Sequence, residues 1–305
     1  MEKFRINRIL FLSVIIFSSF LYACTSFVEE IDLPFKEPPI VVHSYLYPGM
    51  EEIQVSVLYA ANVGGGRNAD EQQPVRNAMV RIWSRIHSPL VLPFDDATGL
   101  FSASSTHLPV VSGVEYFLKI ELPGRLPIEG RVMVPFGNKR FYANLVLSET
   151  RGDMHNLRFD AHIEDKLGEK NFYKFFAFVE GERVCVDGAS ITTTPFSDLI
   201  FNFTSLESDE NRDGQIIFFP GRQLYYSTRQ SPGNCPHRVD HLRMRLFFLE
   251  EQTYRYLESV YAFDAAIGNP FVVPQSPVTN LTNAVGVFGA YALVEKIILA
   301  EDFGL

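Results

Sequence analysis

Short segments with the pattern of β-strands, separated by turn residues, follow one another from Ile40 onward. Residues 40–47 (IVVHSYLY) are β-branched and aromatic and end at Pro48-Gly49, and residues 52–59 (EIQVSVLY) alternate polar with apolar side chains. Such alternation is typical of a strand with one buried face, and Pro-Gly is a turn signal. Similar segments lie at residues 78–86, 99–102, 114–122 and 131–134. This spacing predicts an immunoglobulin-like or transthyretin-like β-sandwich over residues 37–136.

A second β-rich domain is predicted over residues 137–305, after a boundary at Gly137-Asn138. Phe and Tyr number 27 and 13 in the chain, and many of them lie in this part, so we expect its core to be aromatic. The pattern does not distinguish a sandwich from a barrel here. The strand-like segments are residues 141–147, 156–163, 171–180, 183–186, 199–203, 215–219, 223–227 and 242–249.

One segment, residues 250–267 (EEQTYRYLESVYAFDAAI), has the pattern of a helix rather than a strand. Its apolar residues approximate a helical stripe, Glu250 and Glu251 suit a helix N-terminus, and Gly268 suits a helix end. Prolines then predict an extended crossing, and residues 286–299 predict a closing strand or hairpin. The expected fold class is therefore mainly β, with one α-helix near 250–267.

The N-terminus has the pattern of a lipoprotein signal peptide. Basic residues precede an apolar run over residues 9–21, which is followed by Ala23 and Cys24. The run is shorter than the ~20 apolar residues of a membrane-spanning helix. We expect residues 1–23 to be removed, Cys24 to carry lipid, and residues 24–36 to form an acylated tether. The pattern predicts a location on a bacterial envelope membrane, with the leaflet left open.

The acidic charge excludes one class of partner. The formal net charge is −9, and removal of residues 1–23 brings it to about −11. Binding to nucleic acid depends on neutralising phosphates, so we expect no nucleic-acid partner. Anionic lipid would also repel the chain, so we expect the N-terminal lipid to hold it at the membrane.

Only three cysteines occur, Cys24, Cys185 and Cys235. If Cys24 is acylated, the other two form an even pair in an oxidising compartment, where a disulfide is expected. Two unpaired buried thiols are the alternative, and the sequence does not choose between them.

One acidic pattern suggests a metal site without completing it. Asp209–Gly214 (DENRDG) matches the first half of a calcium loop, but Pro220 occupies the position of the bidentate Glu. We therefore expect an acidic turn before a strand. Asp95-Asp96 and Glu164-Asp165 are also expected to be solvated turn acids.

A second group, Cys235, His237, Asp240 and His241, combines metal-ligating residue types. Strand-like surroundings argue against the one-turn spacing that would bring the two histidines together. We expect a disulfide or a surface loop there, and no metal or other cofactor. The chain also carries no recognisable catalytic motif, so we expect a protein that is not an enzyme.

Several segments, in order, resemble the domain-of-unknown-function 4249 family of Bacteroidetes lipoproteins. Their order and spacing carry the resemblance, which extends over nearly the whole mature chain. This chain lacks the glycine that the family usually has within residues 281–285, which leaves the local turn open. The matching segments are residues 39–42, 75–82 (VRNAMVRI), 113–120 (GVEYFLKI), 171–173, 254–257 (YRYL), 269–274, 279–281 and 286–291 (GVFGAY).

The resemblance implies a surface or periplasmic lipoprotein of the bacterial outer membrane, often encoded beside TonB-dependent outer-membrane receptors, and it supplies no catalytic residues. We therefore expect a non-enzymatic binding or accessory partner of an uptake receptor. Two alternatives remain open: an envelope hydrolase with an unrecognised site in the second domain, and a structural or adhesion lipoprotein. The small-molecule or glycan ligand is left open.

Overall fold

The computed structural model describes residues 38–60, 73–137, 140–151, 154–187, 190–202, 206–219, 223–227, 237–267, 271–272 and 275–303. Contacts divide the chain into two compact units, Met1–Pro38 with Asn62–Asp70, and Pro39–Ala61 with Glu71–Leu305. Every element below belongs to the second unit. Among the described residues, no helix is long and apolar enough to span a lipid bilayer.

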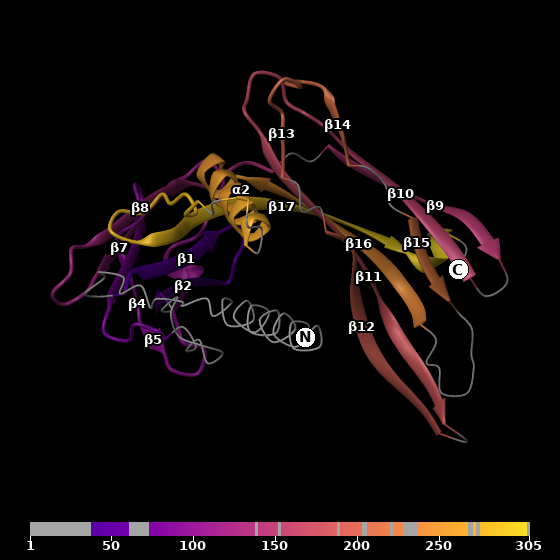
Figure 1. Cartoon of the computed structure of the whole chain (residues 1–305), viewed down its shortest axis with the longest axis horizontal. Coiled ribbons are helices and arrows are strands. Elements are labelled where there is room, and N and C mark those ends of the chain that lie inside the picture. Colours follow the sequence, from indigo (N-terminus) through magenta and orange to yellow (C-terminus); the bar gives the residue numbers. More distant parts are fainter. Residues whose placement is uncertain are drawn as a thin grey trace, which may run out of the picture. The chain divides into compact units, whose positions relative to one another are not determined.

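The described residues of the second unit form mainly β-strands (Figure 1). They include one α-helix, as the sequence predicted. The helix α2 spans Glu251–Ala266, and two short 3-10 helices lie at Ser105–His107 and Ala300–Phe303. The strands are β1 (Ile40–Leu46), β2 (Glu52–Tyr59), β3 (Met79–Ser84), β4 (Leu90–Leu92), β5 (Phe94–Asp95), β6 (Leu100–Ser104), β7 (Glu115–Glu121), β8 (Ile128–Met133), β9 (Phe141–Arg151), β10 (Met154–Glu164), β11 (Phe172–Asp187), β12 (Ser190–Asn202), β13 (Glu207–Ser208), β14 (Ile216–Phe219), β15 (Gln223–Ser227), β16 (His237–Leu249) and β17 (Val285–Leu299).

The C-terminal strand β17 joins the two predicted domains into one sheet. It pairs in parallel with β1 and antiparallel with β16, within a nine-stranded sheet whose order is β12-β11-β16-β17-β1-β2-β6-β5, with β13 paired to β11. Two four-stranded sheets complete the described part, one with order β4-β3-β7-β8 and one built around β10. All three sheets are open, with end strands on each side.

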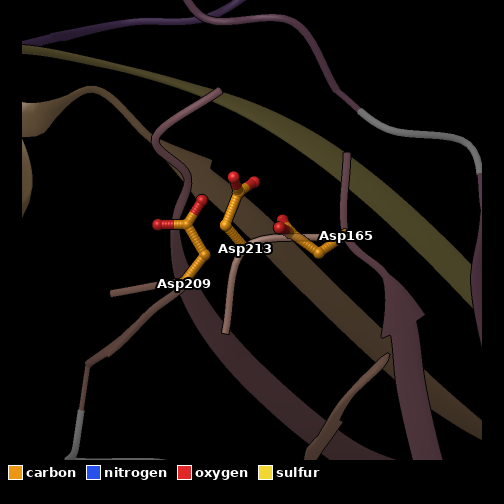
Figure 2. A group of neighbouring side chains, drawn as sticks. All are labelled: Asp165, Asp209 and Asp213. Atoms are coloured by element: carbon orange, nitrogen blue, oxygen red, sulfur yellow. The ribbon is translucent and has the colours of Figure 1, made fainter. Parts of the chain in front are cut away.

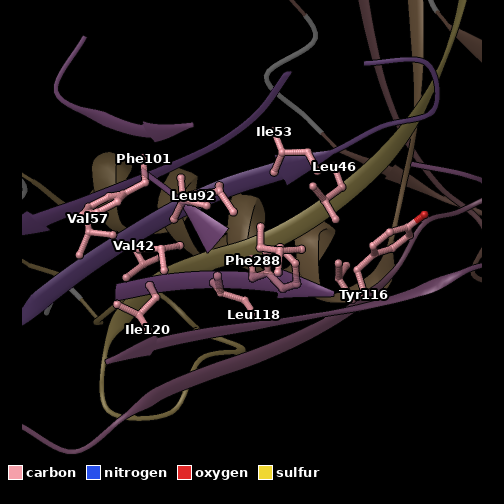
Figure 3. Packing of buried hydrophobic residues seen from close by; sticks show 14 of the residues in the cluster. Val42, Leu46, Ile53, Val57, Leu92, Phe101, Tyr116, Leu118, Ile120 and Phe288 are labelled. Carbon is pink, nitrogen blue, oxygen red and sulfur yellow. The ribbon is translucent and has the colours of Figure 1, made fainter. Parts of the chain in front are cut away.

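Two hydrophobic cores form between these sheets. The first packs β1, β2 and β6 against β3 and β7, and Phe288 of β17 lies within it (Figure 3). The second is rich in aromatic residues, as expected, with Phe175 and Phe219 stacked at 5.0 Å between ring centroids. Leu281, Phe288 and Ala290 belong to the first core. The last segment of the chain therefore completes the part that the sequence assigned to residues 37–136.

One long strand replaces two predicted short ones. The sequence predicted separate strands at residues 171–180 and 183–186, with a break between them. Instead β11 continues through this point and pairs with β12 on one side and with β16 on the other. The register on the β16 side shifts between Glu180 and Gly181, which is a β-bulge. Two neighbouring strands thus hold the segment in which the sequence predicted a break.

An ion-pair network fastens β16 to both of its neighbours. Arg243 donates to Glu180 of β11 and to Glu295 of β17, both at 2.9 Å, and all three side chains are less than a third exposed. Burial opposes ionisation of both carboxyls, but the hydrogen bonds from Arg243 and its neighbours outweigh burial and lower both pKa values below the usual 4.5. The network therefore links strands through charges that exist at neutral pH.

We expect Arg243→Met to lower the free energy of unfolding by about 2 kcal/mol at neutral pH. Both carboxyls have lower pKa values in the folded state than in the unfolded state. Their contribution is therefore complete above the unfolded value of about 4.5 and disappears as pH falls through the folded values. The difference between wild type and variant should narrow from about pH 6 to about pH 3 in urea titrations. Arg76→Met, which removes an exposed pair with Asp96, should show little difference at any pH.

Candidate functional site

An open pocket of about 680 Å³ lies over the face of β1, β2 and β17 that is turned away from the first core. We call it the tyrosine pocket. Alternation along β1 buries Val42 and Leu46 on the core side and leaves the intervening side chains on the other face. Lining side chains include His43, Tyr45, Tyr47, Glu52, Gln54 and Tyr291.

The aromatic side of the pocket depends on the parallel pairing of β1 with β17. Tyr45 lies in register with Gly289, and a Cβ atom at Gly289 would lie 2.9 Å from the Tyr45 ring. Tyr47 and Tyr291 stack with centroids 5.0 Å apart and an interplanar angle of 13°. Gly289 therefore leaves the space in which the ring of Tyr45 crosses β17.

Helix α2 contacts one lining residue of the pocket, His43. The His43 Nε2 atom and the Tyr256 hydroxyl form a hydrogen bond of 2.6 Å, and burial lowers the pKa of the imidazole. Ser56 is the register partner of His43 and also lines the pocket, but no hydrogen bond joins the two side chains. The Oγ1 atom of Thr253 in α2 accepts a hydrogen bond of 2.9 Å from the backbone N–H of Ala290, which fastens the helix to β17. The pocket thus holds a neutral histidine that is engaged with a tyrosine.

A second group of side chains, the aspartate cluster, consists of Asp165, Asp209 and Asp213. One oxygen from each carboxyl lies within 4.8 Å of the others, and the three groups face one another in Figure 2. Asp165 follows β10, whereas Asp209 and Asp213 belong to the turn before β14. Asp165 is only 9% exposed, so the expectation that Glu164-Asp165 would be two solvated turn acids is wrong for Asp165.

Each carboxyl of the aspartate cluster fixes backbone or side-chain donors. Asp165 accepts from the Tyr173 hydroxyl and from Gly214 N–H at 2.9 Å. Asp209 accepts from Asn171 N–H at 2.8 Å, and Asp213 accepts from Gly168 N–H at 2.8 Å. Burial raises the pKa of Asp209, and the charges of Asp165 and Asp213 raise it further. The hydrogen bonds of the cluster therefore join three chain segments, although the three carboxylates repel one another.

The turn itself is the acidic turn that the sequence predicted at Asp209–Gly214. Asn211 and Gly214 have φ values of 69° and 71°, in the left-handed region that asparagine and glycine tolerate. The three carboxyls are oxygen ligands of the type that Ca²⁺ prefers, but Ca²⁺ takes about six to eight oxygen ligands. Three side chains would supply fewer than that, so water or backbone oxygen would have to complete a site.

Asp165 also lines a neighbouring pocket of about 660 Å³. Arg140 and Glu164 line the same pocket and form an ion pair of 3.0 Å. The sequence pointed to Asp209 and Asp213 through their spacing, but it did not indicate that Asp165 would join them.

The described members of the group expected in a disulfide or a surface loop, namely His237, Asp240 and His241, lie in strand β16 rather than in a loop. His241 binds Glu180 at 2.6 Å, and Asp240, the next residue along the strand, pairs instead with Arg238 at 3.4 Å. The register passes from Glu180–His241 to Gly181–Val239, so Asp240 is the extra residue of the β-bulge, and Asp240 and His241 both lie outside the core with different partners. Cys235 lies outside the described residues, as does the side chain of His237.

The lipid attachment and disulfide residues belong largely to segments that the structure does not describe. Cys24 and the tether lie outside the described residues. Cys185, in β11, is disulfide-bonded. Its pairing with Cys235 stays a prediction, because Cys235 lies outside the described residues.

At the turn where the family usually has a glycine, this chain places an asparagine in a left-handed backbone conformation. Asn283, within residues 281–285, has a φ of 55°. Asparagine tolerates this left-handed conformation better than other non-glycine residues. Asn283 also donates to Pro127 O at 2.9 Å, which fastens the turn to the chain before β8.

Comparisons with known proteins identify a family but no activity. No curated protein matches this chain. A crystal structure of a Salmonella alpha-2-macroglobulin mutant is similar at 10% identity and a TM-score of 0.23, over 86% of this chain and 15% of that one. At that TM-score the likeness supports no argument about function. A family model described as a domain of unknown function, DUF4249, matches residues 28–297. The chain therefore belongs to the DUF4249 family, as the order of its motifs predicted.

Proposed function

We propose that this protein is a lipid-anchored lipoprotein of the bacterial outer membrane that acts as a non-enzymatic binding partner in a TonB-dependent uptake system. The observation that carries the binding role is the tyrosine pocket. Its volume of about 680 Å³ lies within the usual range for sites of small ligands. Aromatic side chains with polar neighbours supply both contact area and orientation in such sites.

The chemistry of the pocket favours recognition over catalysis. A serine nucleophile needs a base within hydrogen-bonding reach. In the pocket, His43 uses Nε2 to bind Tyr256 and forms no hydrogen bond with Ser56. The remaining lining side chains are three tyrosine rings, an amide, two carboxylates, Met50 and Leu100, which suit binding.

The anchor rests on the sequence pattern that ends at Cys24. We expect the mature protein to begin at Cys24 and to carry acyl chains, because several chains hold a protein on a membrane more firmly than one. The mass of the intact protein purified from membranes should exceed that of residues 24–305 by the lipid. Cys24→Ser should abolish this increment and release the protein from the membrane fraction. An unmodified N-terminus in wild type would contradict the anchor.

The uptake role is tested by deletion and complementation. We expect cells that lack the protein to take up a nutrient of its partner receptor more slowly when that nutrient is scarce. Wild type should restore the rate, and Tyr47→Leu with Tyr291→Leu should not. Unchanged uptake in the deletion strain would favour a structural or adhesion lipoprotein instead.

One observation favours the hydrolase alternative. Three carboxyls converge beside a pocket in the second β-rich part, which is an arrangement used for acid and base catalysis. If this alternative holds, the purified protein should cleave an ester or glycoside probe, and Asp209→Asn should remove that activity. We expect no such activity, because each carboxyl already accepts hydrogen bonds that fix the fold.

A further inference from the structure

We infer that the tyrosine pocket accepts the cationic head group of a small organic ligand, such as a quaternary ammonium or a protonated amine. This inference rests on the proposed binding function and names the ligand class. Its basis is the combination of aromatic walls with carboxylates in a pocket whose described lining contains no lysine or arginine.

The charge of the lining has one sign. Glu51 and Glu52 both line the pocket and are both exposed. Hydrogen bonds from Ser102 and Gln54 lower the pKa of Glu52, so its carboxyl is charged at neutral pH. The negative lining favours a cation over a neutral or anionic group of the same shape.

The aromatic walls add a second attraction for a cation. Tyr45, Tyr47 and Tyr291 all line the pocket, and the negative face of an aromatic ring attracts a cation within about 6 Å of its centroid. Burial and the neighbouring Tyr47 raise the pKa of Tyr291 to about 12, so it remains a neutral phenol. Tyr47 and Tyr291 cover one face of each other, so a cation would meet the outer side of this stacked pair and the ring of Tyr45.

The guanidinium of Arg245 lies near the pocket but does not neutralise the negative charge of its lining. Arg245 acts on Tyr291, but its guanidinium is ion-paired with Glu295 at 2.8 Å. The neutral imidazole of His43 adds no positive charge to the pocket. The local balance of charge in the lining therefore remains negative.

The test compares two probes of the same shape that differ in charge. Choline and dimethylbutanol, its uncharged carbon isostere, are titrated by calorimetry against the full acylated protein in detergent micelles, with empty micelles as blank. We expect choline to bind about tenfold more tightly than the isostere. Tyr47→Leu with Tyr291→Leu should remove binding, whereas Tyr291→Phe, which keeps the ring, should retain it.

Matched variants separate the pocket from general effects of substitution. Tyr142→Leu removes a tyrosine that is 42% exposed and lies outside the pocket, and it should leave choline binding unchanged. Glu51→Gln with Glu52→Gln should weaken choline binding and leave isostere binding unchanged. Thermal unfolding of each variant shows that the fold is kept.

Three outcomes would overturn the inference. They are the absence of choline binding at millimolar concentration, equal binding of choline and its isostere, and choline binding that survives loss of both rings. Equal binding that the tyrosine variants abolish would leave the proposed binding function intact, because the pocket would then accept uncharged ligands.

Discussion

Gly286→Ala is expected to lower the free energy of unfolding by about 4 kcal/mol, one of the two largest losses that we predict for a single substitution. Gly286 has a φ of 105°, which side chains rarely adopt. An added Cβ would lie 2.1 Å from the carbonyl oxygen of Val42, its register partner in β1. Both atoms belong to backbone that pairs β1 with β17, so neither can move without disturbing the sheet.

The measurement is thermal unfolding, with a matched glycine as control. A loss of this size should lower the midpoint by about 10 °C in a chain of this length. Gly124→Ala has a similar positive φ of 75° but no heavy atom within 4 Å of the added Cβ. It should therefore cost only about 1 kcal/mol, from backbone strain. Equal midpoints for the two variants would contradict the described approach of β17 to β1.

Asp165→Ala should cost about 3 kcal/mol, because it leaves two inward-facing donors without their acceptor. The Tyr173 hydroxyl and Gly214 N–H both donate to Asp165, and Tyr173 is 1% exposed. Asp213→Ala, which removes one bond at an exposed position, should cost about 1 kcal/mol. Urea unfolding of the two variants checks the difference.

A double-mutant cycle assigns the loss to the hydrogen bond. Tyr173→Phe removes the donor and keeps the ring in the second core. The cost of the double variant should fall short of the sum of the single costs by about 1 kcal/mol or more. Additive costs would show that Asp165 stabilises the fold without Tyr173.

The local sequence pattern was sufficient to predict strands and helices whose own residues alternate or cap in a regular way. β2 and β7 alternate strictly, and α2 begins at Glu251 after an N-cap at Glu250 that binds Thr253 N–H at 3.0 Å. Pattern failed at β11, because pairing with β12 and β16 carries the strand through the break predicted at residues 181–182. It also missed β5 and β13, which are two residues long and owe their form to a neighbouring strand.

The two candidate sites depend on contacts between distant segments. Alternation predicts that His43, Tyr45 and Tyr47 share one face of β1. It does not predict that β17 lies beside β1 in parallel and brings Tyr291 to Tyr47. Asp209 and Asp213 show their turn in the sequence, whereas Asp165 reaches them through the pairing of β10 with β14. The sequence therefore indicates which side chains share a strand face or a turn, but not which distant side chains they contact.

We propose that the protein is anchored by lipid and works as a binding partner of an uptake receptor. The most direct test of this proposal is affinity purification of the tagged, acylated protein from outer membranes in mild detergent, with Cys24→Ser processed in parallel. We predict that a TonB-dependent receptor copurifies with wild type in a fixed ratio and is lost with the unanchored variant. Recovery of the wild-type protein alone, fully acylated and folded, would contradict the proposed partnership with an uptake receptor.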